Sequence, residues 1–197
     1  MRDQWYADHR DLVKWATLLH VAQTHGIVTI VQVACYRPDA FTKHKLSVDG
    51  NQVDIPGAVW EHFRNVHAIQ GLTERTGIAI HVIADLYCQP RHAYYARIIR
   101  RLTQLQAHPM VVFLDPDTGI EPGNASLNHV LEAEIGQIFE AMCVGDVLVF
   151  YQHARHTATW QNDTRAQFAR AIKRVTGVQT VACPSLASDV AFFTVMK

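Results

Sequence analysis

Two carboxylates stand close together in residues 115–119 (Asp-Pro-Asp-Thr-Gly), directly after the apolar run at 110–114. Carboxylates at this spacing on a tight turn can share a divalent cation, because Mg²⁺ prefers oxygen ligands and usually takes one or two carboxylates. We therefore expect Asp115 and Asp117 to be catalytic groups that bind Mg²⁺ or Mn²⁺. The structural alternative is a type I turn that Asp115 caps and in which Gly119 supplies the sharp bend.

Basic groups follow the apolar run at 146–151. His153 suits a general base or a metal ligand, and equally a hydrogen-bonded structural histidine. Arg155 suits a bidentate contact with a phosphate or carboxylate, or a solvated surface position. Carboxylates beside basic groups favour a metal-dependent hydrolase of phosphate esters, with a nucleotide or nucleic acid as substrate. In that enzyme His153 would activate water and Arg155 would hold phosphate oxygens.

The elements that position these groups are read from hydrophobic patterns. Continuous apolar runs rich in β-branched residues predict strands covered on both faces, at 27–35, 78–84, 110–114 and 146–151. Periodic apolar stripes predict helices between them, at 9–24, 57–74, 92–107, 126–142 and 163–176. Their alternation predicts one domain over residues 1–197, a three-layer Rossmann-like α/β fold with a mostly parallel sheet flanked by helices.

Two further features depart from the strand–helix alternation. The segments at about 178–183 and 188–196 follow each other without a helix, so we expect a C-terminal antiparallel pair. Alternating residues on either side of Asp49-Gly50 predict a β-hairpin insertion near residues 43–55.

Polar side chains follow every predicted parallel strand, and ligands bind at the carboxyl ends of such strands. Arg37 follows the first strand and Asp85 the second, while Asp115 and His153 follow the third and fourth. We therefore expect Arg37, Asp85 and Arg155 to contact substrate beside the catalytic groups.

Composition limits the kinds of partner that the chain can bind. The 18 basic and 18 acidic residues leave no net charge, so a nucleic-acid partner would depend on a local patch. The arginines and tyrosines of 92–107 could form one, although a solvated helix face explains them as well. No apolar run reaches the length of a membrane span. The charged fraction of 18% is low, which suits either a fold with much buried sheet or a subunit of a homo-oligomer.

The four cysteines form no Cys-x-x-Cys pair, so a zinc knuckle or a dithiol redox motif is not expected. Free thiols and an N-terminal segment without an apolar core indicate a reducing, cytoplasmic compartment.

Two stretches resemble class I S-adenosylmethionine-dependent methyltransferases that act on amino groups of nucleic acid. Residues 11–15 (Asp-Leu-Val-Lys-Trp) resemble a lysine-containing segment of adenine methyltransferases, and 111–117 resemble their apolar strand followed by Asp-Pro-Pro-Tyr. The closing helix–strand–strand order is also similar. The resemblance implies S-adenosylmethionine as cofactor near Lys14, and contact of the target amine with Asp115 and the Pro116 carbonyl.

The sequence also departs from that family. The first strand runs into Ala34-Cys35-Tyr36 without the glycine-rich loop, and Asp117 stands where the family has a second proline. The motif at 115–121, with Tyr-Gln-His after the next strand, also resembles a bacterial family to which we attach no activity. Three hypotheses stay open: a metal-dependent hydrolase, a methyltransferase or a derivative of one, and a non-catalytic binding or oligomer-forming module.

Overall fold

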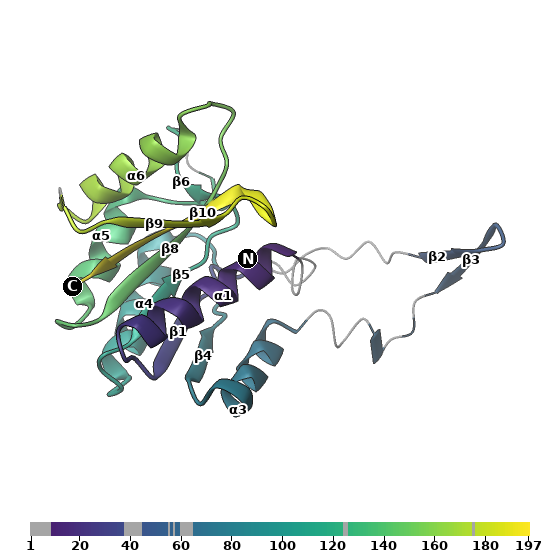
Figure 1. Ribbon diagram of the computed structural model, residues 1–197, viewed down its shortest axis with the longest axis horizontal. Coiled ribbons are helices and arrows are strands. Elements are labelled where there is room, and N and C mark those ends of the chain that lie inside the picture. The colour runs from purple at the N-terminus through teal and green to yellow at the C-terminus, as the bar shows by residue number, and fades with distance from the viewer. Residues whose placement is uncertain are drawn as a thin grey trace.

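The computed structural model describes a central sheet with helices on both faces (Figure 1). It covers residues 9–37, 45–54, 56, 58–59, 65–123, 126–174 and 176–197. The main sheet has six strands in the order β4-β1-β5-β8-β10-β9. These strands are β1 (Thr29–Val33), β4 (Ala79–Ile83), β5 (Val111–Leu114), β8 (Val147–His153), β9 (Gln179–Cys183) and β10 (Ala187–Met196).

Strand directions confirm the predicted fold class. β4, β1, β5 and β8 are mutually parallel, whereas β10 lies antiparallel to both β8 and β9. After β4 the chain crosses back to place β5 on the other side of β1. The sheet order therefore reverses at the β1–β5 boundary, which is the topological switch point where open α/β sheets bind ligands.

The helices cover the sheet as the apolar pattern of its strands requires. Their bounds are α1 (His9–Thr24), α3 (Leu72–Thr76), α4 (Arg91–Gln104), α5 (Glu132–Ala141) and α6 (Trp160–Ala171), with a 3-10 helix η2 (Val66–Gly71) before α3. On one face, α4, α5 and α6 pack their apolar side chains against alternate strand residues such as Val112 and Phe150. On the other face, α1 packs Trp15 and Leu18 against the intervening residues such as Phe113.

One predicted helix is shorter than its apolar stripe. The helix predicted at 126–142 begins only at Glu132, because His129–Val130 forms a short strand, β7, beside β6 (Gly119–Ile120). Backbone bonds to Thr118 and Glu121 hold this segment extended. In the separate prediction at 57–74, residues 58–59 are helical and η2 and α3 follow from Val66 onward, while residues 57 and 60–64 lie outside the described part.

The hairpin prediction is confirmed where the structure describes it. β2 (Lys45–Val48) and β3 (Asn51–Asp54) pair antiparallel around Asp49-Gly50, both of which have positive φ. Positive φ at both central residues matches the twist of hairpin strands. The pair adds no strand to the main sheet. Within the described residues, no helix has the length and apolar character needed to cross a membrane.

Candidate functional site

The switch-point edge, meaning the residues that follow β1 and β5, is assembled by a short extension of the sheet. The Asp115 amide donates to the Val33 carbonyl at 3.0 Å, which carries the pairing one residue past β5. Cys35 then turns the backbone with φ 42°, a left-handed value that few non-glycine residues adopt. The chains after β1 and β5 thus leave the sheet side by side.

Asp115 lies beneath this edge in a buried ionic network. Its Oδ2 accepts hydrogen bonds from Lys14 Nζ at 3.1 Å and from Gln32 Nε2 at 2.7 Å. Lys14 Nζ also donates to Asp11 Oδ1 at 2.8 Å, and all four side chains are buried. The structure therefore joins Lys14 of α1 to Asp115, as expected if both belong to one site.

The charges of this network depend on each other. Burial raises the pKa of Asp115, and the Lys14 ammonium works against that rise. For Lys14 itself, burial favours the neutral form, but Asp115 and Asp11 outweigh burial and raise its pKa. The ammonium also lies 5.3 Å from the ring centroid of Tyr151. Lys14 is therefore charged in the fold. Asp115 is only 1% exposed, so its carboxylate stabilises the edge from the protein interior.

Asp117 has different partners from Asp115. Its carboxylate pairs with the guanidinium of Arg37, which also donates to the Asn128 side-chain oxygen. The side chains of Asp117 and Arg37 keep 12% and 21% of their surface exposed. Burial opposes the charged form of Asp117, but positive charges nearby, including the Arg37 guanidinium, outweigh burial and lower its pKa. Among the described residues of the edge, Arg37 and Asp117 are polar groups that keep part of their surface exposed.

The turn at 115–119 is clamped by Gln152, a residue that sequence reasoning did not select for the site. Its Oε1 accepts from the Ile120 amide at 3.0 Å, and its Nε2 donates to the Thr118 carbonyl at 3.2 Å. Gly119 has φ 117°, and a Cβ there would lie 2.3 Å from Gln152 Oε1. Glycine is therefore required on both counts. The signal available in the sequence was a lone amide side chain in an otherwise apolar strand.

His153 points to another neighbourhood. Its Nε2 lies 3.2 Å from Asp189 Oδ2, and the same carboxylate accepts from Arg10 Nε at 3.0 Å. These contacts tie the end of β8 to β10 and α1. In the arrangement described here, His153 is engaged by Asp189, while Asp115 and Asp117 are engaged by cations of their own.

Arg155 and Asp85 likewise have partners other than Asp115 and Asp117. Arg155 donates to the Ile120 carbonyl at 2.8 Å and to Gln167 Oε1 at 2.9 Å, which fixes the loop after β6. Burial lowers the pKa of this guanidinium. Asp85 forms ion pairs with Arg101 at 3.0 Å and Arg97 at 3.8 Å on α4. The structure thus unites Lys14 with Asp115 and Arg37 with Asp117.

The predicted metal site at Asp115 and Asp117 stays a prediction. Among the described residues, the one group of three or more side chains whose ligand atoms gather closely enough for a metal ion is His108, Cys143 and Asp146. That group lies before β5 and β8, at the other end of these strands. Mg²⁺ between Asp115 and Asp117 would have to compete with Lys14 and Arg37 for the carboxylates.

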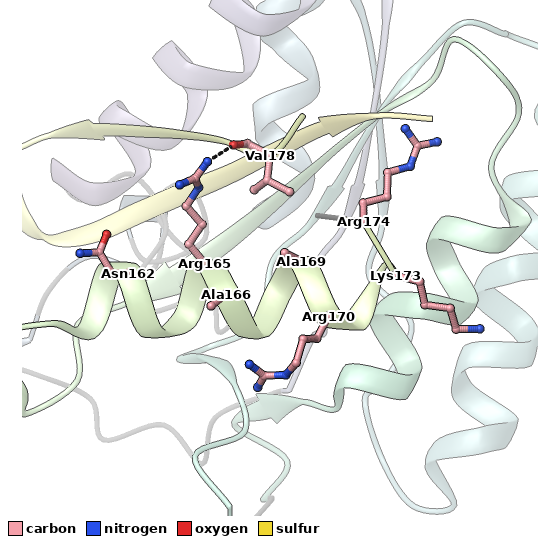
Figure 2. Close-up of a pocket in the computed structure, with 8 residues that line it drawn as sticks. All are labelled: Asn162, Arg165, Ala166, Ala169, Arg170, Lys173, Arg174 and Val178. Atoms are coloured by element: carbon pink, nitrogen blue, oxygen red, sulfur yellow. Dashed lines mark hydrogen bonds between the residues drawn. The ribbon is translucent and has the colours of Figure 1, made fainter. Parts of the chain in front are cut away.

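Away from the switch-point edge, a hollow lined by several cationic side chains lies along α6 (Figure 2). Arg165 donates to the Val178 carbonyl at 2.6 Å, Arg170 pairs with Glu132 and Lys173 with Glu140. Sequence reasoning did not select these residues, which form an ordinary basic helix face in the sequence. Their partners within the protein satisfy much of the positive charge.

Comparison with known proteins assigns no family. No protein-family model and no curated protein matches the chain. Among solved structures, it is similar to the crystal structure of a DUF574 family protein from Streptomyces avermitilis, with a TM-score of 0.40 and 12% sequence identity. The match covers 96% of this chain and 82% of that chain, and likeness at this level assigns no function.

Proposed function

We propose that this chain binds S-adenosylmethionine at the switch-point edge, as an amino-group methyltransferase or a relative that keeps the fold and the ligand. One observation carries the proposal. The two stretches that resemble methyltransferases are 101 residues apart in sequence at Lys14 and Asp115, yet these side chains are in direct contact. Two separate stretches that resemble one family support the same function when their side chains form a single site.

The closing part of the sheet supports the same proposal. α6 is followed by the edge strand β9, and β10 then inserts antiparallel between β8 and β9. This helix–strand–strand arrangement is the one that the resemblance includes. It also places β1 and β5 centrally, with the switch point between them.

The residues at the edge fit the polar groups of S-adenosylmethionine. In nucleotide-binding α/β folds, an acid after the second strand accepts the ribose hydroxyls. Asp85 occupies that position after β4, and its partners Arg97 and Arg101 are half-exposed. Arg37 would hold the carboxylate of the ligand. The glycine-rich loop is replaced by Cys35, which makes a left-handed turn with a buried side chain.

The burial of Asp115 changes the role that the resemblance implies for it. A carboxylate that is 1% exposed and held by Lys14 and Gln32 has no surface for a target amine. In our proposal Asp115 positions the turn that follows it. Asp117, which is partly exposed, would accept the hydrogen bond from the amine.

The test is calorimetry and thermal denaturation with S-adenosylmethionine and S-adenosylhomocysteine. A ligand at one hundred times its dissociation constant stabilises the folded state by about 2.7 kcal/mol, so a clear rise in melting temperature is expected. Asp85→Asn and Arg37→Gln should each weaken binding. The matched control is Asp49→Asn in the exposed hairpin turn, which should bind as the wild type does. No stabilisation at millimolar ligand would contradict the proposal.

A further inference from the structure

A second set of chemically reactive side chains gathers at the amino-terminal end of β5 and β8. His108 precedes β5, Cys143 follows α5, and Asp146 immediately precedes β8. Their nitrogen, sulfur and carboxylate atoms all lie within 4.8 Å of one another. The switch-point edge is at the opposite ends of the same strands, so this cluster is a separate site.

The imidazole contacts both of the other side chains. His108 Nδ1 lies 3.0 and 3.1 Å from the two carboxylate oxygens of Asp146, and His108 Nε2 lies 3.5 Å from Cys143 Sγ. Asp146 accepts, so His108 carries its hydrogen on Nδ1. Nε2 then keeps a lone pair and lies near enough to the thiol to take its proton.

Asp146 is held rigidly, which fixes the ring in this orientation. The carboxylate is 0% exposed and accepts from the Met110 amide at 2.9 Å and the Cys143 amide at 2.8 Å. These two hydrogen bonds hold the carboxylate in place against the imidazole. This is the arrangement of a nucleophile, a base and a carboxylate that orients the base.

Zinc also accepts these three kinds of ligand, but the described residues supply only three of them, one fewer than a closed structural zinc site uses. The experiment therefore includes zinc retention as an outcome.

We propose that Cys143 is a base-activated thiol that exchanges with low-molecular-weight disulfides. The Cys143 proton moves to His108 Nε2, and Sγ attacks one sulfur of the disulfide. A new sulfur–sulfur bond forms, the old one breaks, and the departing thiolate takes the proton from His108. Cys143 is thereby oxidised to a mixed disulfide, and half of the small disulfide is reduced to a thiol.

The surroundings of Cys143 select this chemistry over acyl transfer. Acyl transfer needs backbone amides free to bind an oxyanion. Here the Cys143 amide donates to Asp146, and the Gly145 amide donates to the Lys197 carbonyl. Disulfide exchange places its charge on sulfur and needs no such donors. Cys143 is exposed, and it directly follows the carboxyl end of α5, where a thiolate gains nothing from the helix dipole. Activation therefore depends on His108.

The test isolates Cys143 in a Cys88→Ser/Cys183→Ser background, since these two thiols are partly accessible. Burial raises the pKa of Cys35 to about 12, so that thiol stays neutral and covered. The rate of reaction with excess 5,5′-dithiobis(2-nitrobenzoate) is measured from pH 6 to 9.5, with chelator present. A circular dichroism spectrum and a melting curve confirm that each variant is folded.

His108→Gln should lower the rate at pH 7 by at least about tenfold, because proton removal from the thiol then lacks its base. At pH 9.5, where a thiol ionises without help, the two rates should converge. The matched control isolates Cys88 in Cys143→Ser/Cys183→Ser, where His108→Gln should leave the rate unchanged. Equal rates at pH 7 with and without His108 would overturn the proposal, as would one zinc ion retained through dialysis by the wild type and lost in Cys143→Ser.

Discussion

Two buried aspartates stand at opposite ends of the same sheet and are satisfied in different ways. Asp115, after β5, is paired with the side chains of Lys14 and Gln32, which come from other elements. Asp146, before β8, accepts from the amides of Met110 and Cys143 and from His108. Among the described residues, the Asp115 carboxylate depends on the side chains of Lys14 and Gln32, whereas the Asp146 carboxylate has backbone donors that no side-chain substitution removes.

The two aspartates therefore stabilise different parts of the protein. Asp115 stabilises the switch-point edge, and Asp146 stabilises the loop between α5 and β8. A buried charge that loses the cation in contact with it keeps its desolvation cost, so the Lys14–Asp115 pair links α1 firmly to the switch-point edge. A carboxylate bound by amides retains most of its stabilisation when one side-chain partner is lost. We therefore expect partner removal to be severe at Asp115 and mild at Asp146.

The largest effect is expected from Lys14→Met. This substitution leaves the carboxylates of Asp115 and Asp11 without their shared cation, and it should lower the free energy of unfolding by about 3–5 kcal/mol. Urea denaturation measures the loss. Lys14→Met combined with Asp115→Leu should recover part of it, and the exposed control Lys173→Met should change stability by less than about 1 kcal/mol. A loss under about 1 kcal/mol in Lys14→Met would remove the contrast between the two aspartates.

At the other end, Asp146→Ala should cost about 2–4 kcal/mol, because the Met110 and Cys143 amides lose their acceptor. His108→Ala should cost less than about 1 kcal/mol, since both amides remain bound. The two variants are compared by the same urea titration. If His108→Ala were as destabilising as Asp146→Ala, the imidazole and not the backbone would be the main partner of this carboxylate.

The turn above Asp115 can be tested with two glycines that share one backbone conformation. Gly119 and Gly123 have φ of 117° and 116°, but only Gly119 would place a Cβ against Gln152. Gly119→Ala should therefore be less stable than Gly123→Ala by about 1–3 kcal/mol, the usual cost of overpacking. Melting temperatures of the two variants give the comparison. Equal losses of stability would show that backbone strain alone causes them, and that the Gln152 side chain moves aside for the added Cβ.

The smallest effect is a dependence on alkaline pH. Because folding raises the pKa of Lys14 above 10.5, its contribution to stability is complete below pH 10.5 and declines above it. The stability difference between wild type and Lys14→Met should narrow by up to about 1.4 kcal/mol per pH unit above that value. For His108→Ala, the difference from wild type should stay constant over the same range. A constant difference for Lys14→Met would mean that folding does not raise the pKa of this lysine.

The fold could be predicted from the sequence largely because the strands are buried on both faces. Continuous apolar runs such as 110–114 have few alternatives to a central parallel strand, and Asp49-Gly50 selects a hairpin turn. The helix prediction at 126–142 was too long because its periodic stripe includes residues that pair with the loop after β5. Periodicity does not show such competition from the backbone.

The strand ends at which the candidate residues lie could be predicted from the sequence, but the contacts between their side chains could not. The expectation that Asp115 and Arg37 lie at strand ends required only the strand order. That Lys14 would contact Asp115, and Arg37 would contact Asp117, depends on side-chain directions that only the packed structure fixes. For the same reason His153 was grouped with the aspartates, although it lies against Asp189 on β10.

A crystal structure of the chain grown with millimolar S-adenosylhomocysteine tests the central claim most directly. We predict that the ligand lies over the carboxyl ends of β1 and β5, with its ribose at Asp85 and its carboxylate at Arg37. Lys14 should remain bound to Asp115 beneath it. A ligand bound instead in the basic hollow along α6, or an empty switch-point edge at that concentration, would contradict the account.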